Sequence, residues 1–325
     1  MPPTTIVYVG TENGVSPLAY VGSRWRSAPA GLTGRPVVAT AHPPNQPATM
    51  YAAVRGYGLY KTEDNGLNWK QILSVNAHAL ALDEADEARL WVGTEPVGLW
   101  RSENGGETWL DLSDNLRRLP SALDWRFPSP PYQARLRTIC QIPGRPQTLL
   151  GGIEIGGLVR SDDGGDQWQL SGDELDDDVH ALTVHPSGDN YWLASTGDGS
   201  YRSLDAGQSW ESASDGLAEF YTGPLVILRS GAAVIAATGT PPGNWIENAT
   251  STLYYSADKA ATWQSVELNQ PEYITSLAGD ALSPKTVYVG TQSGRLYLSR
   301  DEGHSWEVMA ELGAEINSIV SLRVG

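Results

Sequence analysis

An eight-residue segment that recurs along the chain constrains the fold more than any other feature. It occurs as TEDNGLNW (62–69), SENGGETW (102–109), SDDGGDQW (161–168), SLDAGQSW (203–210), SADKAATW (256–263) and SRDEGHSW (299–306). Every copy begins with Ser or Thr and ends with Trp. Two copies depart from the pattern, because Asn104 replaces the aspartate and Ala260 replaces the central glycine. A segment repeated along most of a chain predicts an array of similar structural units.

The spacing of the segments indicates the size of the unit. The closing tryptophans lie at positions 69, 109, 168, 210, 263 and 306, and three of the intervals span 40, 42 and 43 residues. A four-stranded propeller blade needs about 40–45 residues. The two longer intervals contain the segments 113–137 and 240–251, which we interpret as insertions into the unit.

Each unit has the pattern of four short strands. In residues 179–214 the runs VHALTVHP, NYWLAST, SYRS and SWESAS are rich in Val, Thr, Tyr and Trp and are separated by turn residues. Such runs, bounded by Gly, Pro, Asp and Ser, are typical of β-strands. No segment has a 3.6-residue apolar period of helix length. Each unit is therefore predicted to be a four-stranded antiparallel blade.

The two ends of the chain complete a further unit. INSIVSLRV (316–324) matches the first strand of a unit, TIVYVGT (5–11) matches the second, and a degenerate fourth strand is expected around Trp25. Pairing the two ends closes a ring and leaves no large open sheet edge. We predict an all-β, seven-bladed β-propeller. It would form one domain over residues 1–325, closed by pairing 316–324 with the N-terminal blade.

The chemistry of the repeated segment is that of a turn. Its Ser or Thr hydroxyl and its Asp carboxylate can accept hydrogen bonds from backbone amides of the hairpin. Glycine tolerates a positive φ, and the tryptophan can pack between neighbouring sheets. We therefore interpret the segment as a structural element, called here the clamp turn. In an up-and-down blade it lies on the face opposite the insertions 113–137 and 240–251.

The clamp turn resembles the Asp-box, or BNR, repeat. That repeat occurs in sialidases, sortilin-type receptors, xyloglucan-degrading enzymes and a photosystem II assembly propeller, and the six copies cover almost the whole chain. The resemblance implies a propeller fold. It carries over no site residue, because the sialidase R-I-P motif is absent and the nearest text, RFP at 126–128, lies in another blade.

The net charge and the hydropathy of the chain limit the classes of partner that it can bind. The formal net charge is −16, which argues against nucleic acids and anionic membrane surfaces. No run of about 18 apolar residues predicts a membrane helix. The N-terminus enters a strand pattern without a leader-like segment, so we expect a cytoplasmic protein.

The face opposite the clamp turns is the expected functional face, because long loops on a rigid ring commonly carry function. Polar residues near the axis come from the starts of inner strands and from the loops between second and third strands. The candidate catalytic residues are Glu95, Glu154, His78, His180, Tyr221 and Tyr273. The candidate ligand-binding residues are Arg35, Arg55, Arg135, Arg137, Asp178, Asp198, Glu12, Trp125 and Trp245. Glu315 and Asn317 start the last inner strand at the same face.

These residues allow several kinds of chemistry. Glu95 and Glu154 can form an acid–base pair as in glycoside hydrolysis, or can cap their own loops. With His78 and His180 they can also bind a divalent metal, but no metal-binding motif supports this and we predict no cofactor. The arginines can hold a carboxylate or phosphate, or pair with the glutamates. Aromatic residues in LDWRFPSPPY (123–132) can form a stacking wall, or pack on their own blade.

Three functions remain open at this stage. The first is a hydrolase-like or lyase-like enzyme acting on a polar, anionic or carbohydrate-like substrate. The second is a non-catalytic protein that binds a ligand or a protein partner. The third is a scaffold that docks other proteins. A fold shared by many functions does not choose among them.

Overall fold

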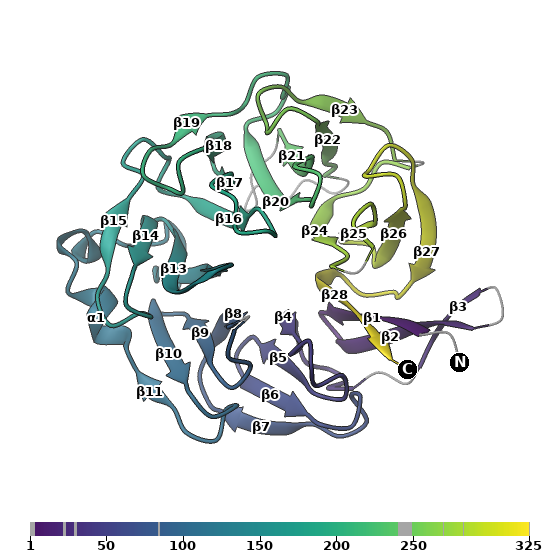
Figure 1. The fold of residues 1–325 in the computed structure, drawn as a ribbon, viewed down its shortest axis with the longest axis horizontal. Coiled ribbons are helices and arrows are strands. Elements are labelled where there is room, and N and C mark those ends of the chain that lie inside the picture. The colour runs from purple at the N-terminus through teal and green to yellow at the C-terminus, as the bar shows by residue number, and fades with distance from the viewer. Residues whose placement is uncertain are drawn as a thin grey trace.

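The computed structural model describes residues 4–21, 24–28, 31–83, 85–239, 249–268, 270–281 and 283–324. Seven four-stranded antiparallel sheets form a ring around a central axis, as Figure 1 shows. This confirms the predicted seven-bladed β-propeller. Among the described residues, no helix is long and apolar enough to cross a membrane.

The blades are numbered here in chain order, each from its inner to its outer strand. Blade 1 contains β28 (Ile316–Val324), β1 (Thr4–Thr11), β2 (Gly14–Val21) and β3 (Arg24–Ser27). Blade 2 contains β4 (Val37–Ala41), β5 (Met50–Val54), β6 (Gly58–Thr62) and β7 (Lys70–Leu73). Blade 3 contains β8 (Ala77–Leu82), β9 (Leu90–Thr94), β10 (Gly98–Ser102) and β11 (Leu110–Asp111).

The other four blades follow the same plan. Blade 4 contains β12 (Arg135–Ile142), β13 (Arg145–Glu154), β14 (Gly157–Ser161) and β15 (Gln169–Ser171). Blade 5 contains β16 (Val179–Val184), β17 (Trp192–Thr196), β18 (Gly199–Ser203) and β19 (Glu211–Ser212). Blade 6 contains β20 (Tyr221–Ile227), β21 (Ala233–Thr238), β22 (Thr252–Ser256) and β23 (Gln264–Val266). Blade 7 contains β24 (Ile274–Gly279), β25 (Val287–Thr291), β26 (Arg295–Ser299) and β27 (Glu307–Glu311).

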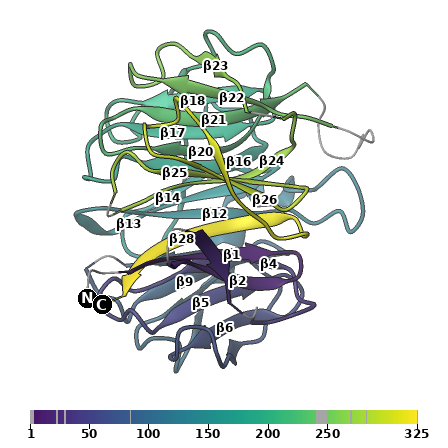
Figure 2. The same cartoon turned by 90° about the vertical axis from the view of Figure 1, so that its right-hand side faces the viewer.

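The ring is closed by the two ends of the chain, as predicted. β28 pairs antiparallel with β1, and Figures 1 and 2 show the yellow and purple strands side by side. The expected degenerate fourth strand is β3, in which Trp25 pairs with Tyr20 of β2. Trp25 packs against a cluster that includes Val7 of blade 1 and Tyr288 of blade 7. Closure therefore buries the seam between the first and last blades.

The hydrophobic core lies between neighbouring blades. One cluster joins Trp91 and Leu99 of blade 3 to Leu136 and Trp168 of blade 4. Second strands such as β9 are buried along their whole length, because they are covered on both faces. The closing tryptophan of each clamp turn belongs to a cluster with the preceding blade, which confirms its predicted packing role.

The clamp turns form the predicted hydrogen bonds. In blade 5 the Ser203 hydroxyl donates to Asp205 Oδ1 and accepts from the Gly207 amide, each at 2.8 Å, while Asp205 Oδ1 also accepts from the Ser209 amide at 3.0 Å. The same pattern recurs in the other five turns, including the one in which Asn104 replaces the aspartate. The fifth residue has a positive φ in every turn, even where it is Ala260, at 58°.

The link between blades 3 and 4 contains two short helices that the sequence pattern did not predict. α1 (Ser113–Arg117) and the 3-10 helix η1 (Pro120–Leu123) follow β11. α1 has little more than one turn and is held by burial of Leu116 rather than by a side-chain cap. The predicted insertion 113–137 ends inside β12, which begins at Arg135. In the second insertion, residues 240–248 lie outside the described part of the chain.

Candidate functional site at the axial mouth

The inner strands begin on the face that carries the links between blades, and the clamp turns lie on the opposite face because neighbouring strands run antiparallel. The axial mouth is defined here as the starts of the seven inner strands and the adjacent turns between second and third strands. Most of the candidate residues lie here. Trp245 lies outside the described residues.

A β-bulge near the start of each inner strand sets which side chains reach the mouth. In β8, Ala77 pairs with Thr94 and Ala79 with Gly93, so His78 is the extra residue. The equivalent extra residues include Arg137 in β12, His180 in β16, Thr275 in β24 and Asn317 in β28. Bulges commonly redirect a side chain beside a functional site. Six blades thus place an extra residue at the same position, and these six residues are of five types because His occurs twice. The sequence alone did not reveal the bulges.

Three of these residues bond across to the next blade. His180 Nδ1 lies 2.6 Å from the Thr222 carbonyl oxygen, Thr275 Oγ1 donates to the Ile316 carbonyl at 2.6 Å, and Asn317 donates to the Val37 carbonyl at 3.2 Å. A carbonyl only accepts, so His180 Nδ1 carries a proton. His180 Nε2 faces Asp178 Oδ2 at 3.2 Å, and its ring packs on Tyr221. These contacts stabilise the ring as well as shaping the mouth.

Glu154 is the most strongly paired carboxylate at the mouth. It lies opposite Arg135 in the strand register, binds Arg135 Nε, and accepts from Arg137 Nη1 at 2.6 Å, while its side chain is only 4% exposed. Burial alone would raise the pKa of Glu154, but Arg137 and Arg135 outweigh burial and hold this pKa at about 2. Glu154 is therefore ionised at neutral pH and has no proton to donate as a general acid.

Arg137 projects from its bulge with most of its donors uncommitted. Among the described residues, its side chain forms one hydrogen bond, from Nη1 to Glu154, and 35% of the side chain is exposed. Burial raises the pKa of Tyr221 and of Tyr273, and the positive charge of Arg137 opposes both shifts. The positive charge of Arg137 therefore acts on both phenols.

The second predicted carboxylate is held by a histidine. Glu95 Oε2 lies 2.9 Å from His78 Nε2 and 3.9 Å from Arg135 Nη1. Burial, together with the charges of Arg135 and Arg55, lowers the pKa of His78 to about 3. The imidazole is thus neutral despite its ion-pair distance to Glu95. Arg135 contacts both Glu95 and Glu154, so the two predicted carboxylates do meet at one cation.

The aromatic side chains of the loop 123–132, which precedes β12, have two different environments. Trp125 packs against the core cluster of blades 3 and 4. Phe127 instead lies over Arg135, whose guanidinium carbon is 5.4 Å from the ring centroid, and Tyr132 is 59% exposed. Trp125 therefore packs on its own blade, one of the two alternatives from the sequence, while a stacking wall at the mouth stays a prediction.

The other side of the mouth carries an acidic group. Arg55 binds both carboxylate oxygens of Glu12 at 2.8 Å, and Asn317 donates to Glu12 at 2.9 Å. Burial, followed by the nearby charge of Glu12, raises the pKa of Glu315. Among the described residues, Glu315 forms no ion pair, unlike Glu12, Glu95 and Glu154. It is the mouth carboxyl best suited to hold a proton.

Two further candidates lie at the margin. Arg35 stacks against Tyr57 and Tyr60, with centroid distances of 5.1 and 4.9 Å. Asp198 sits in the β17–β18 turn, where its amide donates to Thr196 Oγ1. Its negative charge acts on Asp176 and Tyr201.

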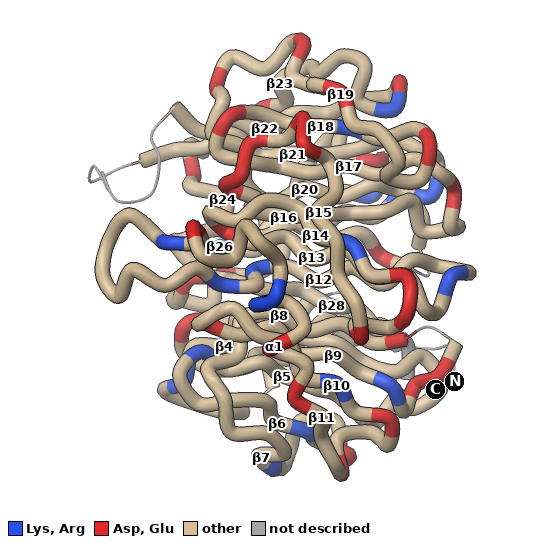
Figure 3. Tube along the Cα trace, turned by 90° about the vertical axis from the view of Figure 1, so that its left-hand side faces the viewer, with Lys and Arg blue, Asp and Glu red and all other residues tan. Residues whose placement is uncertain are grey.

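Sequence reasoning missed one buried ion pair on the same face. Glu272 is 7% exposed, binds Arg295, and accepts from the Ser293 hydroxyl at 2.9 Å. Glu272 lies in the link before β24, and Arg295 begins β26. No local sequence pattern indicates that these two residues pair. In the described part of the chain, no group of three or more His, Cys, Asp or Glu side chains is arranged to hold a metal ion. Figure 3 shows acidic residues scattered over the ring rather than gathered in one patch.

Comparison with known proteins identifies the fold but no family. No family model matches the chain, and no curated protein matches it. The structure of YCF48 bound to D1 peptide is 16% identical with a TM-score of 0.62, covering 86% of this chain and 84% of that one. The GH74 xyloglucanase from Xanthomonas campestris is 18% identical with a TM-score of 0.64, covering 88% of this chain.

The chain spans 46% of the length of that xyloglucanase. YCF48 from Cyanidioschyzon merolae is 14% identical with a TM-score of 0.57, and each chain covers 87% of the other. The similarity shows a β-propeller fold. Enzymes and peptide-binding proteins both occur among these structures, so the likeness leaves the function open.

Proposed function

We propose that the axial mouth binds a polar ligand that carries a carboxylate, such as a uronic acid or an acidic carbohydrate-like molecule. The proposal rests on the hydrogen bonding of Arg137. This side chain donates one hydrogen bond to Glu154, and its other donors lie at the mouth. An arginine fork recognises a carboxylate through two parallel hydrogen bonds. In addition, we infer that the six clamp turns are Asp-box repeats that build the ring and take no part in ligand binding at the mouth.

The surroundings of Arg137 support a ligand of this class. Tyr221 and Tyr273 offer phenol groups beside the guanidinium, and burial keeps them uncharged by raising the pKa of each. Phe127 adds an apolar face over Arg135, on which a sugar ring can stack.

A thermal-shift and calorimetry series tests the proposal. Wild-type protein is titrated with galacturonate and glucuronate, with galactose and glucose as uncharged controls. Arg137→Gln should weaken uronate binding about tenfold or more, the loss expected for a charge-assisted hydrogen-bond pair. Arg24→Gln is the matched control, since Arg24 is an exposed arginine of β3 in another part of the ring. Equal binding of uronates and neutral sugars, or an unchanged Arg137→Gln, would contradict the proposal.

The second candidate is a hydrolase-like or lyase-like enzyme at the same mouth. The observation that favours it is Glu315, a half-buried carboxyl whose raised pKa suits a proton donor. Glu154, ionised with a pKa of about 2, supplies the contrasting carboxylate. Two carboxyl groups with separated pKa values are the usual arrangement for acid–base chemistry on sugars.

Activity assays separate the two candidates. Wild type and Glu315→Gln are incubated with oligogalacturonides and xyloglucan oligosaccharides, and products are followed by chromatography. Turnover that falls at least about a hundredfold in Glu315→Gln supports an enzyme, because general acid catalysis typically contributes that much. Binding without turnover supports the non-catalytic function. Because one of the similar structures, YCF48, holds a bound peptide, a peptide with carboxylate side chains that Arg137 could bind is the third ligand to include.

A further inference from the structure

A pocket on the face of the clamp turns lies between blades 2 and 3. Its volume is about 420 Å³, and its lining includes Lys61, Glu63, Trp69, Ile72, Gly105 and Glu107. It is distant in topology from the axial mouth, because clamp turns and inner-strand starts occupy opposite faces. The proposed function therefore makes no use of it.

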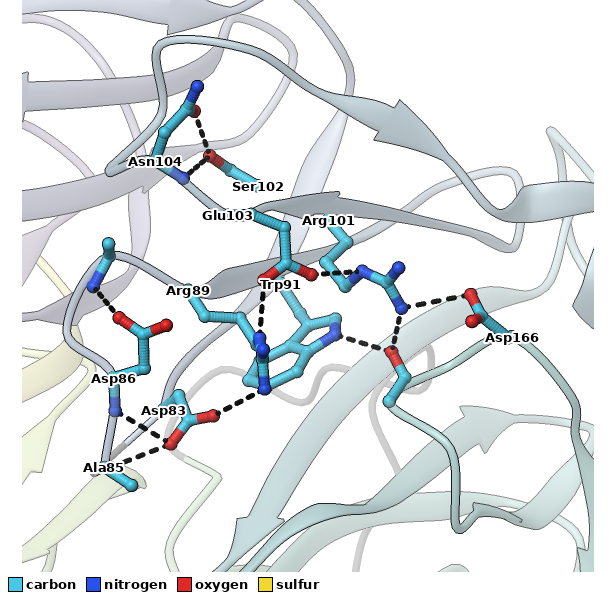
Figure 4. A network of polar contacts seen from close by, with 12 residues as sticks. Asp83, Ala85, Asp86, Arg89, Trp91, Arg101, Ser102, Glu103, Asn104 and Asp166 are labelled. Atoms are coloured by element: carbon cyan, nitrogen blue, oxygen red, sulfur yellow. Dashed lines mark hydrogen bonds and ion pairs between the residues drawn. The ribbon is translucent and has the colours of Figure 1, made fainter.

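The boundary between two neighbouring blades is called here a seam. The seam between blades 3 and 4 shows which side chain occupies the equivalent position there. In blade 3, Arg101 immediately precedes the clamp turn and reaches into the clamp turn of blade 4. Its Nη1 donates to the Gly164 carbonyl at 2.9 Å and to Asp166 Oδ1 at 3.0 Å. Trp91 Nε1 donates to the same carbonyl at 3.0 Å. Figure 4 shows Arg101 held between Glu103 and Asp166.

Arginines bridge the next two seams in the same way. Arg160 donates to the Ala206 carbonyl at 3.0 Å, and Arg202 donates to the Lys259 carbonyl at 3.1 Å. In each case the acceptor is the fourth residue of the next clamp turn. The carbonyl at this position is thus a repeated acceptor for a guanidinium that crosses the seam.

The seam between blades 2 and 3 has the same hydrogen-bond acceptors, but it has no arginine that crosses from one blade to the next. Gly105 and Glu107 occupy the positions of Gly164 and Asp166, and Tyr51 donates to the Gly105 carbonyl at 3.2 Å as Trp91 does to Gly164. The bridging position holds Lys61, whose ammonium instead binds Glu63 at 2.8 Å. Among the described residues Glu107 forms no ion pair, although its negative charge helps to raise the pKa of Lys61. We call Glu107 and the Gly105 carbonyl the arginine seat.

We propose that this seat binds the guanidinium of an arginine side chain from a partner protein. The internal arginine of the next seam supplies the template, because the same two acceptor positions hold Arg101 there. Trp69 and Ile72 line the pocket and can pack against the aliphatic stem and the flat face of the guanidinium. The net charge of −16 favours the approach of a basic partner.

The charges around the seat are consistent with a cation. Glu63, Asp64 and Glu107 outnumber Lys61 and Lys70 among the lining residues. Lys61 is already committed to Glu63, and that hydrogen bond raises its pKa against the opposing effect of burial. A guanidinium can bond the carbonyl and the carboxylate together, whereas an ammonium presents no such planar fork.

A nuclear magnetic resonance titration tests the seat with acetyl-arginine amide as the probe. The amide signals of Gly105 and Gly106 and the indole signals of Trp69 and Trp109 should shift and saturate. Acetyl-lysine amide should bind about tenfold more weakly, and acetyl-citrulline amide, which is uncharged, weaker still. Equal shifts with the arginine and lysine probes, or no saturable shift with arginine, would overturn the proposal.

Two variants locate the binding. Glu107→Gln should weaken the arginine probe about tenfold, while the exposed Glu267→Gln serves as control and should leave it unchanged. Lys61→Arg supplies the missing guanidinium from within, so the Gly105 signal should be displaced without probe and insensitive to it. Unaltered probe binding by Lys61→Arg would show that the probe lies outside the seat. None of these outcomes depends on ligand binding at the mouth.

Discussion

The two faces of the ring use the same four-stranded blades in opposite ways. On the face of the clamp turns, six blades repeat one set of hydrogen bonds between residues at most four positions apart, as in Ser203, Asp205 and Gly207. At the axial mouth, one register position carries His78, Arg137, His180, Thr275 or Asn317, each with different partners. Repetition therefore marks the scaffold, and variation at a fixed position marks the candidate site.

The energetic basis also differs between the faces. Clamp turns satisfy backbone amides locally and lie near solvent, so each contributes a modest and similar amount. The mouth instead buries charges that depend on one another, such as Glu154 between Arg135 and Arg137. Removing one member of such a group leaves its partners unpaired, which costs more than one lost hydrogen bond.

The largest expected effect is therefore at Glu154. Removal of one partner from a buried ion pair typically costs about 3–5 kcal/mol. Because the side chains of Arg135 and Arg137 are 27% and 35% exposed, we expect Glu154→Gln to lower the free energy of unfolding by about 2–3 kcal/mol. Urea denaturation measures this change. Glu267→Gln is the control, and a loss no larger than in that control would remove the contrast between the faces.

The next effect tests the equivalence of the clamp turns. Ser203 and Ser256 are 1% and 2% exposed, and each hydroxyl accepts from a buried amide. Ser203→Ala and Ser256→Ala should each lower the free energy of unfolding by about 1–2 kcal/mol, because an unsatisfied buried donor remains. The two losses should agree within about 0.5 kcal/mol. Clearly unequal losses would mean that the turns differ in role despite their common bonds.

The pH dependence of stability separates the two faces in one experiment. The pKa of His78 falls from 6.5 to about 3 on folding, so stability is complete above 6.5 and declines as the unfolded chain takes up the proton. The clamp aspartates Asp205, Asp258 and Asp301 have a pKa of about 2, and their contribution is lost only on further acidification.

Between about pH 7 and about pH 5.5, wild type should lose about 1 kcal/mol more than His78→Asn. Urea titrations at several pH values measure the difference between the two proteins. The difference between wild type and His78→Asn should keep widening down to about pH 3, where folded His78 itself takes up the proton. Below about pH 4 both proteins also lose the contribution of the clamp aspartates, as these carboxylates become protonated in the unfolded state. If the free energies of unfolding of the two proteins changed in parallel over the whole pH range, folding would not lower the pKa of His78.

The sequence predicts the features that depend on residues close together in the chain, and it misses those that depend on residues far apart. The fold follows from the clamp turns and strand patterns, whose interactions join residues close in sequence, and even the pairing of 316–324 with 5–11 followed from their similarity to strands inside the repeats. The mouth depends on bulges and on contacts such as His180 with Thr222, 42 positions apart. The pairing of Glu154 with Arg135 and Arg137 was an open alternative, and α1 was too short to give a periodic signal.

The smallest expected effect is a gain at a clamp turn. Glu302, the fourth residue of its turn, has a φ of 65°, a conformation that costs a side chain about 1 kcal/mol relative to glycine. Glu302→Gly should therefore raise the free energy of unfolding by about 0.5–1 kcal/mol. Glu302→Ala controls for loss of the carboxylate and should bring no gain. An equal gain in both variants would assign the effect to charge rather than to the backbone.

The central claim, that Arg137 makes the mouth a carboxylate-binding site, is tested most directly by a crystal structure with galacturonate at a concentration that saturates binding. We predict the ligand at the mouth, with its carboxylate hydrogen-bonded to the Arg137 guanidinium and its ring near Tyr221 or Tyr273. A mouth without ligand, or a ligand bound only among the clamp turns, would contradict the claim.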